Sequence, residues 1–152
     1  MTTDDPCWRV ARECTAATLR RASRALSNAF DQTLAPAGIR STQFSVLVAI
    51  HLAGRMSLTG LASRLGLDRT TLTRNLGPLR RERLVRETPA EDRRVRFLAL
   101  TPAGEQLVKR ALPLWAFAQR SVIERMGPRR WGTFMRDLES VAASATGGSP
   151  TQ

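Results

Sequence analysis

Apolar side chains recur at spacings of three and four residues over most of the chain, as they do along one face of an α-helix. Between residues 8 and 34 this spacing predicts a long first helix, which Pro36 and Gly38 end. Its apolar positions are Trp8, Ala11, Leu19, Ala22, Leu26, Ala29, Phe30 and Leu34. A helix with one apolar side is expected to pack against other helices.

Two shorter helices are predicted next. The hydroxyl of Ser41 is expected to cap the first of them, in which Phe44, Leu47, Val48 and His51 share a face. A break at residues 54–56, with a minimal strand, separates it from the other. Ser57 is predicted to cap that third helix, whose apolar positions are Leu58, Leu61, Ala62 and Leu65.

A fourth helix, which begins after a Gly66-Leu67 turn, is polar on one side. Asp68 is predicted as its N-cap, accepting from the amide of Thr70 or Thr71, and a kink is expected at Pro78. Its apolar positions are Leu72, Leu76 and Leu79, and its polar positions are Arg69, Thr70, Thr73, Arg74, Arg80 and Arg81. A helix, a glycine turn and a capped helix indicate a helix-turn-helix.

The rest of the chain predicts a β-ribbon and two more helices. Strands are expected at 84–88 and 94–100, joined by a loop at 89–93. Thr101 and Pro102 open a fifth helix, with a bend at Pro113 and an end at Gly127-Pro128. A sixth helix follows, and a disordered tail is expected at 146–152.

The predicted fold class is therefore mainly α with a small β-ribbon. It is a winged helix-turn-helix at residues 41–101, flanked by N- and C-terminal dimerisation helices at 8–36 and 102–145, all within one domain of 152 residues. The terminal helices carry more apolar surface than the winged part can cover, which predicts a two-fold homodimer.

Charge points to an anionic partner. The chain has 24 Lys+Arg against 13 Asp+Glu, a formal net charge of +11, and its arginines concentrate between Arg64 and Arg96. Guanidinium groups bind phosphate or guanine through two hydrogen bonds, and threonine offers a hydroxyl and a methyl group. Double-stranded DNA is the expected partner. The alternative that the charge alone also permits is a DNA-binding protein of the nucleoid type, indifferent to sequence.

Other classes have little support. The longest nearly apolar run, residues 44–54, is too short to span a membrane, and residues 1–7 lack the apolar core of a signal peptide, so a cytoplasmic protein is expected. The chain has one His and 2 Cys, and it shows no metal-ligand cluster, no phosphate-binding glycine loop and no paired carboxylates beside a nucleophile. No enzyme activity, cofactor or metal is predicted.

These motifs, in this order, resemble the MarR family of bacterial transcription regulators over roughly residues 15–125. The likeness rests on Thr42-Gln43-Phe44, on residues 68–74, on Leu84-Val85, on Asp92-Arg93-Arg94 and on residues 100–104. One position departs from the family pattern. Arg83 stands where the family commonly has a glycine that ends the recognition helix, and a left-handed backbone is strained for arginine.

The resemblance implies how DNA is read. The fourth predicted helix would be the recognition helix and would enter the major groove. Its contacts with bases and nearby phosphates would come from Thr70, Thr71, Thr73 and Arg74. Arg69 and Arg93 would contact phosphates. Arg94 would enter the minor groove, oriented by Asp92, and Arg80, beyond Pro78, would contact the backbone. A narrow minor groove attracts a guanidinium because its negative potential is concentrated. Two-fold symmetry implies a roughly palindromic operator with half-sites about 10 base pairs apart.

The resemblance also implies an effector pocket. Its predicted lining is Phe30, Phe44, Leu47, His51 and Trp115, with Arg40 for a carboxylate, and the predicted ligand is a small aromatic acid. Two alternatives stay open. His51 is otherwise a core histidine satisfied by a backbone carbonyl, and the sequence does not exclude a regulator that binds DNA constitutively without any effector.

Cys7 and Cys14 raise an alternative, because some relatives sense peroxides through a cysteine in the first helix. Seven residues along one helix correspond to a rise of about 10 Å, too far for an internal disulfide, so only a bond between subunits is feasible. The relatives that sense peroxides have tyrosines near the reactive cysteine, and this chain has Tyr 0. Ordinary thiols are the expected reading, and redox sensing is the alternative.

Overall fold

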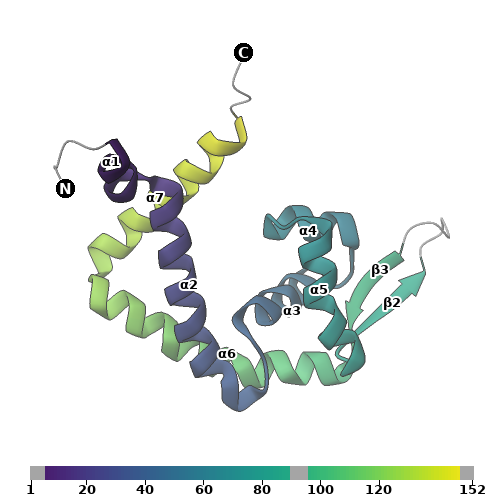
Figure 1. Ribbon diagram of the computed structural model, residues 1–152. Helices are drawn as coiled ribbons and strands as arrows, with labels where there is room; N and C mark the ends of the chain where they lie inside the picture. Colours follow the sequence, from purple (N-terminus) through teal and green to yellow (C-terminus); the bar gives the residue numbers. More distant parts are fainter. Residues whose placement is uncertain (1–5, 90–95, 148–152) are drawn as a thin grey trace. The chain divides into compact units, whose positions relative to one another are not determined.

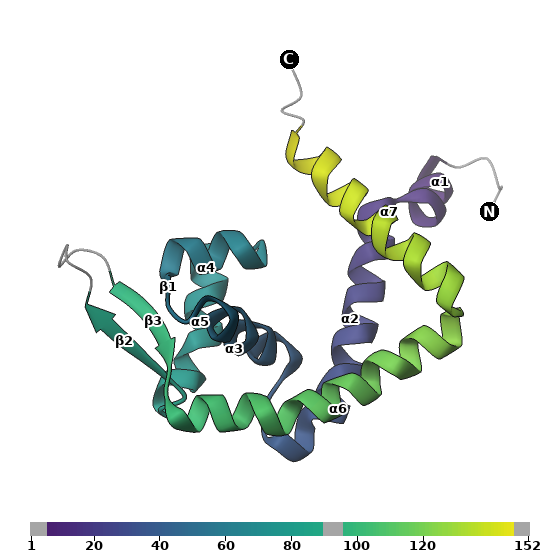
Figure 2. The ribbon, with the colours of Figure 1, turned by 180° about the vertical axis from the view of Figure 1, so that it is seen from behind.

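The computed structural model describes residues 6–89 and 96–147, which fall into two units divided after Trp115. The first unit holds α1 (Pro6–Glu13), α2 (Thr15–Leu34), the 3-10 turn η1 (Ala35–Ala37), α3 (Ser41–Ala53), β1 (Met56–Ser57), α4 (Leu58–Leu65), α5 (Arg69–Arg81), β2 (Val85–Pro89), β3 (Arg96–Leu100) and the start of α6 (Pro102–Met126). The second holds the rest of α6 and α7 (Pro128–Gly147). Figure 1 labels the α-helices and the strands β2 and β3, and Figure 2 also labels β1.

The core of the first unit lies where α3, α4, α5 and the sheet meet (Figures 1 and 2). Leu72, Leu76 and Leu79, the predicted apolar side of α5, are 0%, 0% and 1% exposed. Each fully buried leucine contributes about 1.5–3 kcal/mol relative to an exposed one. The predicted docking face of this helix is thus confirmed, and its opposite side is left to solvent.

The three strands form an antiparallel sheet in the order β1-β3-β2. β2 and β3 pair from Val85 opposite Leu100 to Pro89 opposite Arg96, and β1 adds Met56 opposite Leu98. The predicted minimal strand and the predicted ribbon are both present. Antiparallel pairing places Leu98 and Leu100 on the side of the core, where both are buried. They anchor the base of the wing, which is the ribbon formed by β2 and β3.

Three predicted caps are confirmed and one is wrong. Ser57 accepts from the amide of Gly60 at 3.1 Å, Asp68 caps α5, and Thr101 accepts from the amide of Gly104 at 3.1 Å. Ser41, by contrast, is the first residue of α3 rather than its cap. Its hydroxyl and amide both donate to Oδ1 of Asp31, at 2.6 and 2.7 Å, because a carboxylate is a stronger acceptor than any neighbouring group.

The single first helix predicted for residues 8–34 is also wrong, since α1 and α2 separate at Cys14. Cys14 has an extended backbone, with φ −66° and ψ 102°. The amide of Cys14 still donates to the Val10 carbonyl and the amide of Thr18 to the Cys14 carbonyl. Helical bonding therefore continues up to Cys14 and resumes after it, and apolar periodicity does not register a change confined to one residue.

The predicted disordered tail begins too early, because α7 continues through residues 146 and 147. Alanines with high helix propensity precede these residues, and the hydroxyl of Ser144 bonds the Ser140 carbonyl at 2.8 Å. The rest of the predicted tail lies outside the described residues. Pro78 and Pro113 lie within α5 and α6 without interrupting either helix. The kinks expected at these prolines stay predictions.

The two helices of the helix-turn-helix end in the same hydrogen-bond motif. After α4, the amide of Gly66 donates to Ser63 and that of Leu67 to Ala62. After α5, the amide of Arg83 donates to Arg80 and that of Leu84 to Leu79. Both pairs form a Schellman motif, which places one residue in the left-handed region. Gly66 has φ 62° and Arg83 has φ 55°, so the strain predicted at Arg83 is present.

Replacing Arg83 by glycine is expected to raise the free energy of unfolding by about 0.5 kcal/mol. The left-handed conformation costs a non-glycine residue about 1–2 kcal/mol, and the added freedom of glycine in the unfolded chain offsets part of the gain. Chemical denaturation measures the change. The control is Arg86→Gly, on a strand, which is expected to destabilise. An equal loss in both variants would show that Arg83 is not strained.

Candidate nucleic-acid interface

The first turn of α5 is organised around Asp68. Oδ1 of Asp68 accepts from the amide of Thr71 at 2.8 Å, and Oδ2 accepts from the Thr71 hydroxyl at 2.6 Å. The Thr71 hydroxyl and then its amide lower the pKa of the Asp68 carboxyl, because both bonds favour the charged form. The hydroxyl of Thr71, which was predicted to contact DNA, thus donates its hydrogen bond to the Asp68 cap.

The lowered pKa makes the stability of α5 sensitive to acid. A carboxyl whose folded-state pKa is depressed stabilises the protein fully above its ordinary value of 3.8, and that contribution is lost as the pH falls through the lower folded-state value. Asp68→Ser keeps a capping oxygen that does not titrate. Its free energy of unfolding is expected to fall less than that of the wild type between about pH 4 and pH 2. Parallel profiles in denaturation experiments would refute this role.

The exposed side of α5 carries the side chains that suit DNA. Arg69, Thr70, Thr73 and Arg74 are exposed and line one shallow hollow of about 450 Å³. The Thr73 hydroxyl donates to the Arg69 carbonyl at 2.7 Å, which fixes the direction of its methyl group. Two guanidinium groups beside two threonines provide donors for phosphate and guanine together with methyl groups for thymine. The structure therefore brings four of the predicted DNA-binding residues onto one surface.

Arg80 does not lie with these four residues, and its side chain binds another part of the protein. Its Nη2 lies 2.6 Å from Oε1 of Glu87 on β2, so its guanidinium is ion-paired within the protein. The sequence reading missed Glu87, because the alternation of the strand indicates that its side chain leaves the sheet but not that it meets the end of α5. Asp92, Arg93 and Arg94, predicted at the tip of the wing, lie outside the described residues. Their roles stay predictions.

A cleft of about 320 Å³ lies in the first unit between α3, α4 and α6. It is lined by Phe44, Ser45, Val48, Ala49, Leu52, Arg64, Leu65, Leu112 and Trp115. Phe44 and Trp115 belong to the predicted effector pocket, whereas Phe30, Arg40, Leu47 and His51 do not line this cleft. Leu47 is 0% exposed, because it points into the core. Arg64, which the sequence did not indicate, is the cation among the residues that line this cleft.

His51 is neither a buried core histidine nor part of this cleft. Its Nδ1 lies 2.6 Å from Oε2 of Glu105 on the first turn of α6, and the two side chains are 45% and 39% exposed. The contact was not predictable from the sequence, since 54 positions separate the two residues. The reading of His51 as satisfied by a backbone carbonyl is thus wrong, because a carboxylate from another helix satisfies it.

The two cysteines lie on different elements. Cys7 is exposed on α1, and Cys14 is half-buried at the break before α2. The rise along a single helix therefore does not set the distance between these two cysteines. Redox sensing stays an alternative prediction.

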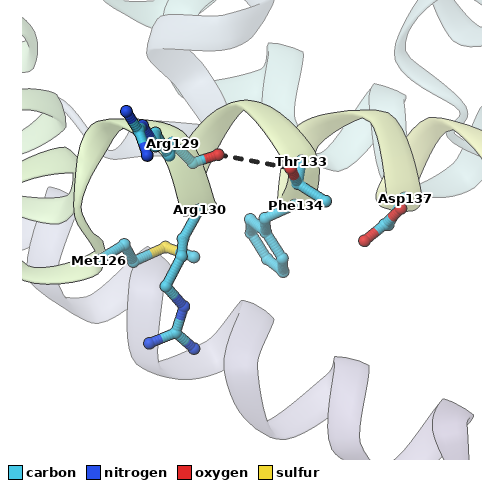
Figure 3. Close-up of a pocket in the computed structure, with 6 residues that line it drawn as sticks. All are labelled: Met126, Arg129, Arg130, Thr133, Phe134 and Asp137. Atoms are coloured by element: carbon cyan, nitrogen blue, oxygen red, sulfur yellow. Dashed lines mark hydrogen bonds between the residues drawn. The ribbon is translucent and has the colours of Figure 1, made fainter.

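A further hollow, of about 380 Å³, lies in the second unit. It is lined by Met126, Arg129, Arg130, Thr133, Phe134 and Asp137. In Figure 3 Arg130 and Phe134 point to the same side of α7. None of the predicted site residues lies here. It is therefore not the pocket that the sequence predicts.

The described residues contain no group of three or more His, Cys, Asp or Glu side chains placed to hold a metal ion. Within residues 6–89 and 96–147 no helix is long and apolar enough to cross a membrane.

A capped helix with an exposed Arg and Thr surface, preceded by a helix and a glycine turn and followed by an antiparallel ribbon, defines a winged helix-turn-helix DNA-binding protein. The MarR family model matches residues 37–95. The chain is similar to the transcriptional regulator MosR of M. tuberculosis, whose structure is known in complex with DNA. The two sequences are 39% identical, and the two structures superpose with a TM-score of 0.81. The match covers 89% of this chain and 98% of the MosR chain.

Two further relatives are more distant. BpsR of Bordetella bronchiseptica, whose structure concerns regulation of its DNA binding by 6-hydroxynicotinic acid, is 25% identical, covers 86% of this chain and 99% of that chain, and gives a TM-score of 0.77. The uncharacterised HTH-type transcriptional regulator YwoH of Bacillus subtilis is 27% identical over 88 residues. That match covers 58% of this chain and 64% of YwoH, less than two thirds of its length.

The chain belongs to the MarR family, and it is a DNA-binding transcription regulator rather than an enzyme. The predicted family and the predicted fold class are both confirmed.

Proposed function

We propose that the protein is a sequence-specific repressor that binds a pseudo-palindromic operator as a homodimer and is released by a small aromatic acid. One observation carries the proposal. α5 buries its leucine side completely and presents Arg69, Thr70, Thr73 and Arg74 together on the opposite side. A helix held in this way by its core is rigid enough to position four side chains against base edges.

Within the operator, Arg74, Thr70 and Thr73 are assigned to base edges and Arg69 to phosphate. The assignment follows their chemistry, because guanidinium recognises guanine and the threonine methyl contacts the thymine methyl. Thr71 is assigned to the Asp68 cap and through it to the placement of the helix. The wing residues Asp92, Arg93 and Arg94 keep the roles that the family resemblance implies.

The homodimer is proposed from exposed apolar side chains at both ends of the chain. Trp8, Val10 and Leu26 are exposed in the first unit, and Phe117 and Val141 in the second, with Val10 65% and Phe117 62% exposed. Large apolar side chains exposed on several helices favour burial against a second subunit. Sedimentation equilibrium tests the proposal. A monomer at micromolar concentration would refute both the dimer and the palindromic operator.

The effector is proposed to bind the cleft lined by Phe44, Leu52, Leu112 and Trp115. Its apolar walls suit an aromatic ring, and Arg64 offers a cation for a carboxylate. BpsR responds to a ligand of this chemical class. Release follows if the ligand binds better to the conformation whose recognition helices mismatch the half-sites.

Footprinting on the DNA upstream of the protein's own gene tests the proposal. The expected result is one protected region with two half-sites about 10 base pairs apart, and loss of protection when an aromatic carboxylate is added. Protection that a panel of such acids leaves unchanged at saturating concentration would remove the effector and leave a constitutive regulator. Uniform protection without half-sites would indicate binding of the nucleoid type.

A further inference from the structure

Three charged side chains meet where the recognition helix ends and the wing begins. Glu87 on β2 binds Arg80 of α5 through Oε1 at 2.6 Å and faces Arg96 of β3 through Oε2 at 3.6 Å. Figure 1 shows β2 leaving the C-terminal end of α5 and β3 returning beside it. One carboxylate thus joins a helix and a strand that both belong to the DNA-binding region.

The register of the sheet explains why Glu87 reaches both arginines. Pro89 pairs with Arg96 and Glu87 pairs with Leu98, and residues two apart on a strand point to the same side. Glu87, Arg96 and Leu98 therefore share the side on which Leu98 is buried in the core. Arg80 lies in the last turn of α5, so its guanidinium meets the carboxylate at the edge of that core.

Stability alone gives a weak reason for this cluster. The side chains of Arg80, Glu87 and Arg96 are 40%, 35% and 71% exposed, and ion pairs with this exposure contribute little to folding. A negative charge within a DNA-binding surface also lowers the attraction to phosphate. What the pairing does provide is a fixed place for two long cationic side chains, which otherwise sample many rotamers.

We propose that Glu87 is a positioning residue that determines specificity by holding Arg80 and Arg96. The proposal rests on the proposed function. While Glu87 fixes the two guanidinium groups, they reach the phosphates only of DNA whose shape fits α5 and the wing at once. Without Glu87 the guanidinium groups can adjust to the phosphates of any sequence. Loss of Glu87 therefore strengthens binding to random DNA more than binding to the operator.

The test compares Glu87→Gln with Glu82→Gln. Glu82 is exposed at the C-cap of α5 and has no ion pair with any residue that the structure describes, so both variants change the net charge equally and at neighbouring places. Binding to the footprinted operator and to random DNA of the same length is measured between 50 and 200 mM salt, conditions in which phosphate contacts dominate the roughly log-linear salt dependence. Circular dichroism confirms folding.

For Glu87→Gln we expect random-DNA affinity to rise about tenfold and the slope of log K against log salt to steepen by about 1 to 2, because each freed cation that meets a phosphate adds about 0.9. The ratio of operator to random affinity is expected to fall at least about fivefold. Glu82→Gln is expected to change the affinities for operator and for random DNA by the same factor. If the ratio of operator to random-DNA affinity were the same in Glu87→Gln and Glu82→Gln, the proposal for Glu87 would be overturned.

A second variant keeps the test decisive if Glu87→Gln does not fold. Arg80→Gln is expected to weaken operator binding while leaving the random-DNA slope unchanged, since Arg80 is held in the wild type. A random-DNA slope reduced by about 1 would show a free phosphate-binding arginine and overturn the proposal. A wild type without preference for its operator would instead refute the proposed function, and the role of Glu87 with it.

Discussion

Replacing Gly104 by alanine is expected to lower the free energy of unfolding by about 3 kcal/mol. A Cβ at this position in α6 would overlap the carbonyl oxygen of Leu84 and lie 3.1 Å from its carbonyl carbon. Both are backbone atoms that hydrogen bonds hold in place, so neither rotates away, and such overpacking costs about 1–3 kcal/mol or more. In a thermal melt this corresponds to a loss of about 6–12 °C.

The reason for this sensitivity is the tight junction between the recognition helix and α6. The amide of Thr101 donates to the Leu84 carbonyl at 3.0 Å, and its hydroxyl donates to the Arg83 carbonyl at 2.7 Å. The same hydroxyl accepts from the amide of Gly104. The end of the α5 turn is thus bonded to the first turn of α6, which is where a conformational change in one helix would reach the other.

Gly77→Ala is the matched control for Gly104→Ala. Gly77 is also helical, and a Cβ there would meet only Nη1 of Arg81 at 3.6 Å, an ordinary contact. Alanine at this position is expected to stabilise by about 0.5–1 kcal/mol, since glycine is a poor helix former. Equal stability of Gly104→Ala and the wild type would show that α6 does not approach Leu84 so closely.

Arg74→Ala is expected to weaken operator binding by about 10- to 100-fold and to relax specificity at one base pair of each half-site. Arg74 is exposed beside Thr70 and Thr73 on the side of α5 opposite the buried leucines. A guanidinium that reads guanine through two hydrogen bonds is worth about 1–3 kcal/mol against the wrong base. Titration of the operator and of its single-base variants measures both effects.

Arg110→Ala controls for the loss of one positive charge, because Arg110 is exposed on α6 away from the helix-turn-helix sequence. This variant is expected to change operator affinity by less than about threefold, since a distant charge acts only through the screened field. Equal losses in the two variants would mean that Arg74 contributes charge alone and reads no base.

Local chemistry made much of the fold predictable. Asp68, Ser57 and Thr101 each cap a helix within three residues of their partners, so their neighbours in the sequence are sufficient evidence. Leucine spacing in α5 likewise predicted which side is buried. Ser41 failed as a cap because its partner, Asp31, lies ten positions away on another helix.

The candidate site was predictable only where one helix forms it. Arg69, Thr70, Thr73 and Arg74 share a surface because helical geometry requires it. Contacts between elements were not predictable. The pairing of Arg80 with Glu87 depends on how β2 leaves α5, and that of His51 with Glu105 depends on how α6 crosses α3. The lining of the cleft was only partly predicted for the same reason, since three helices contribute to it.

Equilibrium binding at physiological salt tests most directly whether α5 and the wing recognise a specific DNA sequence. Affinity is measured for the upstream operator and for shuffled DNA of the same length and composition. We expect the operator to bind about 10³-fold or more tightly than the shuffled DNA, a ratio typical of specific regulators. A ratio near one would contradict it and would leave a basic protein that binds DNA through charge alone.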